Sequence, residues 1–228
     1  MTIPITLQDA LDFMIRNDIN DPEIYSFLST PLDIAAVTKW LKRIDRVNTM
    51  TPSSKRSFKK AFEGKINRLK GKYFEQLAGL ILQTAKPFTS WHSVQSTTNE
   101  LDWLIQIGPS GQHLPAMREW GTHLICECKF SKDYVNVTWV GKLNTVLQTH
   151  GASVGILISS KGMTNRGRGA AAKMTVRILS AMTPPRTIIS FDLEDIRACT
   201  KGTNFLQLLS QRYVEARAGA DRLRLIKT

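Results

Sequence analysis

The sequence predicts an α/β protein with a mixed central sheet flanked by helices, and three observations lead to this prediction. Strand-like segments occupy residues 88–130, an almost uninterrupted apolar run follows at residues 152–159, and segments with helical periodicity lie before, between and after them. The apolar run is typical of a central strand covered on both faces. The alternation of helices and strands favours helices packed on both faces of one sheet.

The N-terminal part of the chain is predicted to be helical. Apolar residues recur there at helical spacing, and Pro22 and Pro31 stand where the first turn of a helix tolerates proline. The expected helices cover residues 6–17, 22–29 and 31–48.

A polar segment at residues 51–56, TPSSKR, interrupts this pattern. We therefore expect two parts, a helical N-terminal appendage at residues 1–60 and a main domain at residues 61–228. The appendage is expected to contact either DNA or a partner protein. The next helix is clearest at residues 66–84 and is expected to begin between residue 54 and residue 66.

One face of this helix carries Gly71, Glu75 and Gly79, each four residues apart. Glycine costs about 1 kcal/mol relative to alanine in a helix interior. Two glycines beside one glutamate therefore predict that another backbone approaches this face closely. The alternative is tight helix–sheet packing, with Glu75 exposed at the edge of the contact.

The downstream elements follow from the same periodicities, with strands alternating every two residues and helices repeating every 3.6. Strands are expected at residues 88–95, 101–107, 122–130, 152–159 and 186–192, helices at 136–149, 165–182 and 203–217, and a loop at 108–121.

The composition limits the class of protein. The chain has 228 residues, 42% of them hydrophobic, which is enough for one large domain with a smaller appendage. No apolar run reaches the length of a membrane span, and no signal-peptide core is present, so no membrane partner is expected. The odd number of cysteines, three, favours a reduced, cytoplasmic setting.

The net charge of +12 favours a polyanionic partner. Residues 1–65 hold ten Lys and Arg against eight Asp and Glu, whereas residues 66–228 hold 21 against 11. A basic surface around an acidic cluster suits a nucleic acid whose phosphate meets a metal ion. The alternative is a basic domain without a specific partner. The acidic cluster is expected to contain Glu75, Glu100, Asp102 and Glu127.

The most informative local pattern is Glu127-Cys128-Lys129 on a predicted strand. Glu127 and Lys129 share one face of this strand, and Cys128 points to the other. Charged groups are costly to bury, so this pair is expected where the sheet meets solvent or a ligand. With Asp102 and Glu75, the chain carries three carboxylates and a lysine in the order expected of a metal-dependent phosphodiesterase site.

The ordered set GKYFE at residues 71–75, ELD at 100–102 and ECK at 127–129 resembles the PD-(D/E)xK nuclease superfamily. Within it, the chain is most similar to Mrr-like restriction endonucleases and archaeal-type Holliday junction resolvases. The strand VGILIS at 154–159 and the alanine-rich helix after it fit the Mrr-like pattern. The resemblance covers residues 66–195 and implies a restriction-endonuclease-like α/β/α core.

The resemblance also implies a Mg²⁺ site in which Mn²⁺ can substitute. Asp102 and Glu127 would be direct carboxylate ligands, with the backbone carbonyl of Cys128 as a third, and Mg²⁺ prefers such hard oxygen ligands. Lys129 would orient or deprotonate the attacking water. Glu75 would bind a second metal ion or hold a metal-bound water, and schemes with one and two metal ions both stay open.

Several residues are accessory candidates. Glu100 shares the face of Asp102, and Gln148 or Asn144 on the following helix could supply an amide; Leu101 stands where the family often has proline. Basic residues after residue 160 are expected to contact DNA near a helix N-terminus, and the alternative is a solvated basic helix. These basic residues are Lys161, Arg166, Arg168 and Lys173, followed by Arg177.

The remaining reactive side chains receive structural roles. Cys126 and Cys128 are expected to be core thiols rather than zinc ligands, because a lone CxC lacks the paired spacing of zinc sites. His92 shows no partner pattern and is interpreted as a surface or edge residue. Trp91, Trp103 and Trp139 are expected in the core rather than as base-stacking platforms.

Together these features predict a divalent-metal-dependent endonuclease of double-stranded DNA that defends against foreign DNA, by restriction or as an effector nuclease. The alternatives are a resolvase of branched DNA and a non-catalytic nucleic-acid-binding subunit of the same fold. Because two strands require two sites, a homodimer or a larger complex is expected.

Overall fold

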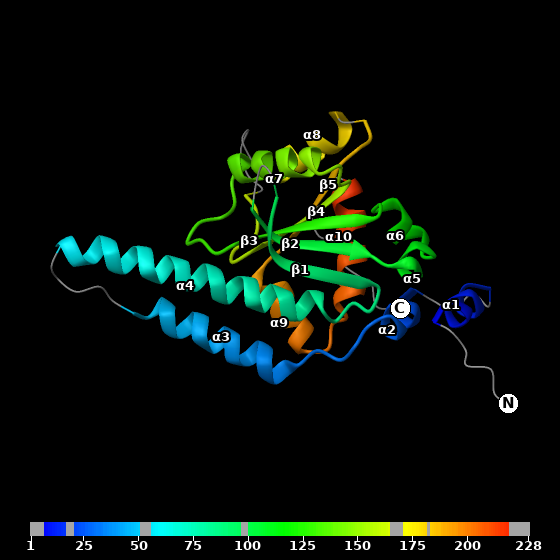
Figure 1. Cartoon of the computed structure of the whole chain (residues 1–228), viewed down its shortest axis with the longest axis horizontal. Helices are drawn as coiled ribbons and strands as arrows, with labels where there is room; N and C mark the ends of the chain where they lie inside the picture. The colour runs from blue at the N-terminus through cyan, green and yellow to red at the C-terminus, as the bar shows by residue number, and fades with distance from the viewer. Residues whose placement is uncertain are drawn as a thin grey trace.

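The protein contains one five-stranded mixed sheet, confirming the predicted α/β class (Figure 1). In this computed structural model the described residues are 7–16, 21–50, 56–96, 100–164, 171–181 and 183–218. The strands lie side by side in chain order, with antiparallel pairing from β1 to β3 and parallel pairing from β3 to β5. They are β1 (Phe88–Gln95), β2 (Glu100–Ile107), β3 (His123–Lys129), β4 (Val154–Ser159) and β5 (Thr187–Phe191).

Helices cover both faces of the sheet (Figure 1). On one face, α4 (Arg56–Leu82), α9 (Leu193–Thr200) and α10 (Phe205–Ala218) bury apolar side chains against the strands. On the other, α7 (Val137–Thr149) and α8 (Ala171–Ala181) form the two parallel crossovers. Every residue of β4 is buried, as its apolar sequence predicts.

The N-terminal segment forms α1 (Leu7–Arg16), α2 (Asp21–Phe27) and α3 (Ile34–Asn48). The predicted start of the third helix was wrong, because Asp33 caps α3 by accepting a hydrogen bond from the backbone N–H of Ala36 at 2.8 Å. Pro31 therefore precedes the helix instead of standing in its first turn. No helix in the described part of the chain is long and apolar enough to cross a membrane.

Helix α4 is continuous over 27 residues and starts at the early end of the predicted range. It packs along α3, and the predicted domain boundary between residues 60 and 61 falls inside α4. Two observations join the α2 region to the rest of the fold. Leu28, just after α2, lies in the same core cluster as Phe74 of α4, and the Tyr25 hydroxyl donates to Ser210 Oγ of α10 at 2.8 Å. The division into two domains stays a prediction.

Two sequence expectations about short helices were wrong. The expected loop at residues 108–121 contains α5 (Pro109–Gln112) and α6 (Pro115–Glu119), each with proline in its first turn. Helix α9 was not predicted at all, although Asp192 and Asp195 form a capping box at its start. Of the expected helix 165–182, α8 accounts for Ala171–Ala181, and residues 165–170 lie outside the described residues.

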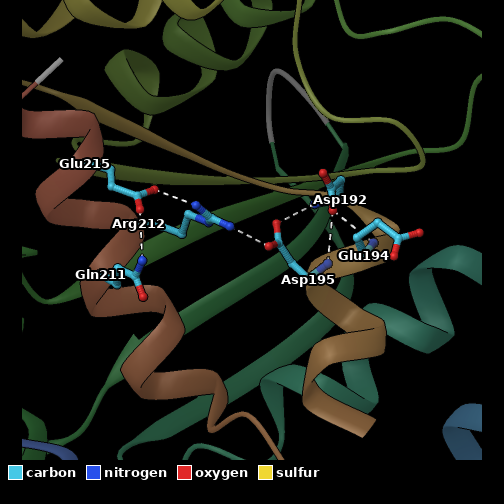
Figure 2. A network of polar contacts seen from close by, with 6 residues as sticks. All are labelled: Asp192, Glu194, Asp195, Gln211, Arg212 and Glu215. Atoms are coloured by element: carbon cyan, nitrogen blue, oxygen red, sulfur yellow. Dashed lines mark hydrogen bonds and ion pairs between the residues drawn. The ribbon is translucent and has the colours of Figure 1, made fainter. Parts of the chain in front are cut away.

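A buried ionic network joins α10 to the start of α9 (Figure 2). The Arg212 guanidinium donates to Asp195 Oδ1 and to Glu215 Oε2, both at 2.6 Å, and all three side chains are almost fully buried. Burial disfavours the charged guanidinium, but the hydrogen bonds to Glu215 and Asp195 outweigh it, so the pKa of Arg212 is raised. Removing one member would leave buried charge unpaired, a loss that typically costs about 3–5 kcal/mol. The network therefore fixes the two C-terminal helices.

Candidate active site

Asp102 lies where β2 and β3 separate. The last residue pair of their ladder is Trp103 with Cys126. One step further along, the backbone N–H of Cys128 donates to Asp102 Oδ2 at 2.7 Å instead of pairing with a β2 carbonyl. In an antiparallel pair a residue directs its N–H and its C=O toward the same neighbour, so the Cys128 carbonyl also lies on the Asp102 side.

Glu127 lies beside this gap, half-buried on β3. Burial, and then the charge of Asp102, raises the pKa of Glu127 to about 7, and Lys129 only partly opposes this shift. Burial also raises the pKa of Asp102 to about 6, against the effect of the Cys128 hydrogen bond. Two carboxyl groups are thus held next to each other with their charged forms disfavoured.

Glu75 and Glu100 extend the same acidic cluster. Glu75 comes from α4 and Glu100 from the exposed start of β2, and each raises the pKa of both Asp102 and Glu127. The structure therefore brings all four predicted acidic residues, from one helix and two strands, close enough to interact electrostatically.

Lys129 completes the predicted set and faces α7. Its Nζ lies 3.6 Å from the ring centroid of Trp139, and Lys142 Nζ lies 4.5 Å from the same ring. The pKa of Lys129 is lowered, mainly by burial and further by Lys142, while Glu127 and Asp102 oppose the shift. The indole thus holds the ammonium group near the carboxylates through a cation–π contact. Trp139 is half-buried and packs against the edge of the core, and Trp103 is buried as predicted. Trp91 is exposed on β1, so its expected place in the core was wrong.

His92 of β1 is a residue of the site that the sequence interpretation missed. Its Nε2 donates to Glu75 Oε2 at 3.0 Å, and its ring lies 4.7 Å from that of Trp103. Ser93 Oγ lies 3.1 Å from His92 Nδ1 and 3.4 Å from His92 Nε2. Glu75 is therefore held from β1, although no sequence pattern connects residues 75 and 92.

The close approach predicted at the glycine face of α4 occurs at Gly79 alone. A Cβ atom there would lie 2.4 Å from the indole of Trp103. At Gly71 the nearest atom to such a Cβ would be Oε1 of Glu75 at 3.9 Å. The approaching group is thus a buried aromatic ring and not a backbone. Because Gly79 has no side chain, α4 can pack directly against Trp103 of β2.

The acidic cluster has the chemistry of a divalent-cation site. Its donors are carboxylate oxygens, which Mg²⁺ and Mn²⁺ prefer, and a bound cation would favour the charged forms of Asp102 and Glu127, which burial and then the neighbouring carboxylates disfavour. Within the described residues, no three His, Cys, Asp or Glu side chains converge closely enough to form a finished metal site. One oxygen of Asp102 is bonded to Cys128 and one of Glu75 to His92. The carboxylate donors and their negative charge suit a divalent cation, but the described side chains are not arranged as a complete set of ligands.

Other predicted residues lie around or away from this site. Gln148 is exposed near the C-terminal end of α7. This end of the helix lies beside the start of β3, because His123 Nε2 is 3.0 Å from the backbone carbonyl oxygen of His150. Since α7 runs antiparallel to β3, Gln148 is at the far end of the strand from Lys129, and the buried Asn144 is one turn closer. The structure does not bring Gln148 to the carboxylates.

The predicted DNA contacts are only partly described. Lys161 is exposed just after β4, whose last residue pairs with Lys129, and Lys173 is exposed on α8. Arg166 and Arg168 lie outside the described residues. Cys126 and Cys128 lie on the α4 face of the sheet and contact each other's thiols, as expected of core residues.

Comparison with known proteins is consistent with this geometry. No curated protein and no solved structure matches the chain. A family model for the catalytic domain of Mrr, described as restriction endonuclease, matches residues 66–183, slightly more than half of the chain. The match includes the part of α4 that carries Glu75, both strands that carry Asp102, Glu127 and Lys129, and the two crossover helices. The chain therefore belongs to the Mrr-type restriction endonuclease family.

Proposed function

We propose that this nuclease-family protein is a divalent-metal-dependent endonuclease that hydrolyses phosphodiester bonds in double-stranded DNA. The observation that carries the proposal is the meeting of Asp102, Glu127 and Lys129 where β2 and β3 separate. Carboxylates next to a phosphate would weaken simple DNA binding, so their presence favours catalysis over a non-catalytic binding role.

Each side chain has a role that its surroundings support. Asp102 and Glu127 would hold Mg²⁺ or Mn²⁺, with the Cys128 carbonyl beside them, and the bound ion would polarise the phosphate and activate water. Lys129 would orient the water and steady the phosphate, and its lowered pKa favours proton transfer at Nζ. Glu75, held by His92, would bind a second ion or a water.

We also propose a biological setting. The family favours defence against foreign DNA, as a restriction enzyme or an effector nuclease. The buried, unpaired thiols of Cys126 and Cys199 support action in the reducing cytoplasm. Because the described residues form one candidate site and a duplex has two strands, the enzyme would act as a homodimer or within a larger complex.

A cleavage assay tests this proposal. Purified protein is incubated with supercoiled plasmid, linear duplex, single strands and a four-way junction, each with Mg²⁺, Mn²⁺ or EDTA. Lys129→Ala should lower the cutting rate about 100-fold or more, while Lys201→Ala, an exposed lysine beyond α9, should cut like the wild type. Preference for the junction would favour a resolvase. Cutting that is independent of metal, or equal in Lys129→Ala, would refute the proposal.

A further inference from the structure

Positive charge is concentrated most densely in one segment of the chain. Residues 34–72 contain 12 Lys and Arg against two Asp and Glu, a net charge of +10 in a chain of net charge +12. Residues 1–33 contain one arginine against six acidic residues. The near-neutral net charge of residues 1–65 is therefore the sum of an acidic segment, residues 1–33, and a basic segment, residues 34–65. We call residues 34–72, which comprise α3 and the first part of α4, the basic arm.

The basic arm is an antiparallel helix pair that extends past the edge of the sheet (Figure 1). Trp40 of α3 packs on Tyr73 of α4, with ring centroids 5.3 Å apart. The Arg43 guanidinium lies 4.4 Å from the Trp40 ring centroid and 6.0 Å from that of Tyr73. These contacts fix the two helices to each other and bring a cation of α3 onto α4.

The exposed cations of the arm form a stripe on each helix. On α4 the stripe consists of Lys65, Arg68 and Lys72, at a spacing that places them on one helix face, and Glu75 follows three residues later on that face. On α3, Lys39, Lys42 and Arg46 repeat the same spacing, opposite the buried face of that helix. The stripe of α4 thus leads directly to the active site.

Nothing in the described part of the chain neutralises these stripes. All six side chains are exposed, and none takes part in an ion pair between described residues. Lys42 with Arg46 and Arg68 with Lys72 are like charges four residues apart, an arrangement that destabilises a helix. Such an arrangement destabilises the free protein and becomes favourable on a polyanion.

We propose that the basic arm binds the backbone phosphates of duplex DNA beside the phosphodiester that the active site cleaves. This inference rests on the proposed function. At 1.5 Å per residue, α4 extends about 15 Å from Lys65 to Glu75 and about 28 Å from Arg56 to Glu75. At 3.4 Å per base pair, the arm would contact about four to eight base pairs on one side of the cut.

The test measures binding without cleavage. Fluorescence anisotropy with a labelled 30-base-pair duplex of arbitrary sequence gives affinity in EDTA at several salt concentrations. The variant is Lys39→Gln/Lys42→Gln/Arg46→Gln, because α3 contributes no residue to the carboxylate cluster. The matched control, with the same loss of charge outside the arm, is Arg118→Gln/Lys201→Gln/Arg217→Gln, and circular dichroism verifies folding of both.

The α3 variant should bind about 10-fold or more weakly at 0.1 M salt, and its slope of log affinity against log salt should become shallower by about 0.9 for each phosphate that the variant no longer neutralises. The control should match the wild type. Equal weakening in both variants, or unchanged binding by the α3 variant, would overturn the inference even if the wild type cleaves DNA. Another outcome is that the wild type cleaves no DNA under any metal condition. In that case weaker binding by the α3 variant would still support the basic arm, and the nuclease proposal would be refuted.

Discussion

Asp102 accepts a hydrogen bond from the backbone N–H of Cys128 at 2.7 Å and so ends the β2–β3 ladder with a side chain. One carboxylate thereby satisfies a backbone donor and separates the two strands. Its second oxygen is not engaged by that bond and belongs to the acidic cluster. The geometry of the site and the pairing of the sheet are consequently determined by the same residue.

Two substitutions of Asp102 separate these roles. Asp102→Asn keeps an oxygen for the Cys128 N–H but loses the charge, so we expect cleavage to fall about 100-fold or more. Because burial raises the pKa of Asp102 to about 6, the unfolding free energy of Asp102→Asn should be at least as high as that of the wild type at pH 7 and above. Asp102→Ala removes the acceptor as well and should cost an additional 1–3 kcal/mol or so of unfolding free energy. Urea denaturation beside a cleavage assay measures both effects. Equal stability of the two variants would show that the hydrogen bond is unimportant.

Glu127 should destabilise the metal-free protein at high pH. Its pKa is raised from 4.5 to about 7, chiefly by burial, so the folded protein keeps a proton that the unfolded chain releases between these values. Stability therefore falls as the pH rises from about 4.5 to about 7. Glu127→Gln should raise the unfolding free energy by about 3 kcal/mol at pH 8 and by much less at pH 5, while abolishing cleavage.

The measurement is denaturation of both proteins in EDTA at the two pH values. Glu194→Gln, an exposed residue of α9 paired with Arg197, is the control and should show no such gain at pH 8. An equal effect of Glu127→Gln at pH 5 and pH 8 would contradict the raised pKa.

His92 should act as a positioning residue for Glu75. His92→Ala removes the donor to Oε2 and should lower the cleavage rate about 10–100-fold, the usual cost of losing a residue that orients a ligand. His92→Gln, whose amide can donate, should recover part of this loss. Titration with Mn²⁺ gives a second measure, because a freely rotating Glu75 would shift the metal concentration required for half-maximal cleavage. Failure of Gln to recover any activity would indicate that the ring's contact with Trp103 matters instead.

Two glycines of α4 should respond in opposite ways to alanine. Gly79→Ala places a Cβ 2.4 Å from the Trp103 ring and should cost about 1–3 kcal/mol by overpacking. Gly64→Ala meets no atom within 4 Å and should stabilise the helix by about 0.5–1 kcal/mol. Thermal unfolding of both variants checks the prediction. A loss of stability in both would show that α4 tolerates no added side chain, whatever Trp103 does.

The sequence was sufficient to predict all five strands of the described sheet, because period-2 alternation and the apolar run of β4 are local patterns. The order Glu75, Asp102, Glu127, Lys129 also predicted which side chains the fold brings together, while their catalytic roles stay a prediction. Contacts between distant residues were not predictable in this way. The pairing of Glu75 with His92 depends on how α4 crosses β1. The short helix α9 carries little apolar periodicity.

Two further sequence interpretations depended on where a residue or a boundary was placed. Gln148 was expected close to the site, but the antiparallel direction of α7 places it at the far end of β3. The charge of the basic arm is diluted when residues 1–65 are taken together, because the acidic residues lie mostly before residue 34 and the basic ones after it. Spatial grouping, which the fold supplies, reveals the concentration of charge.

Because α4 is one unbroken helix from Arg56 to Leu82, it acts as a ruler between the basic arm and Glu75. Each added residue would lengthen the ruler by about 1.5 Å and rotate its two ends relative to each other by about 100°. Spacing and phase are thus coupled: a four-residue insertion before Glu75 would nearly preserve the alignment of stripe and carboxylate, and a two-residue insertion would turn them to opposite sides. The length of this helix would therefore determine the distance along the duplex between the phosphates that the basic arm binds and the phosphodiester that is cut.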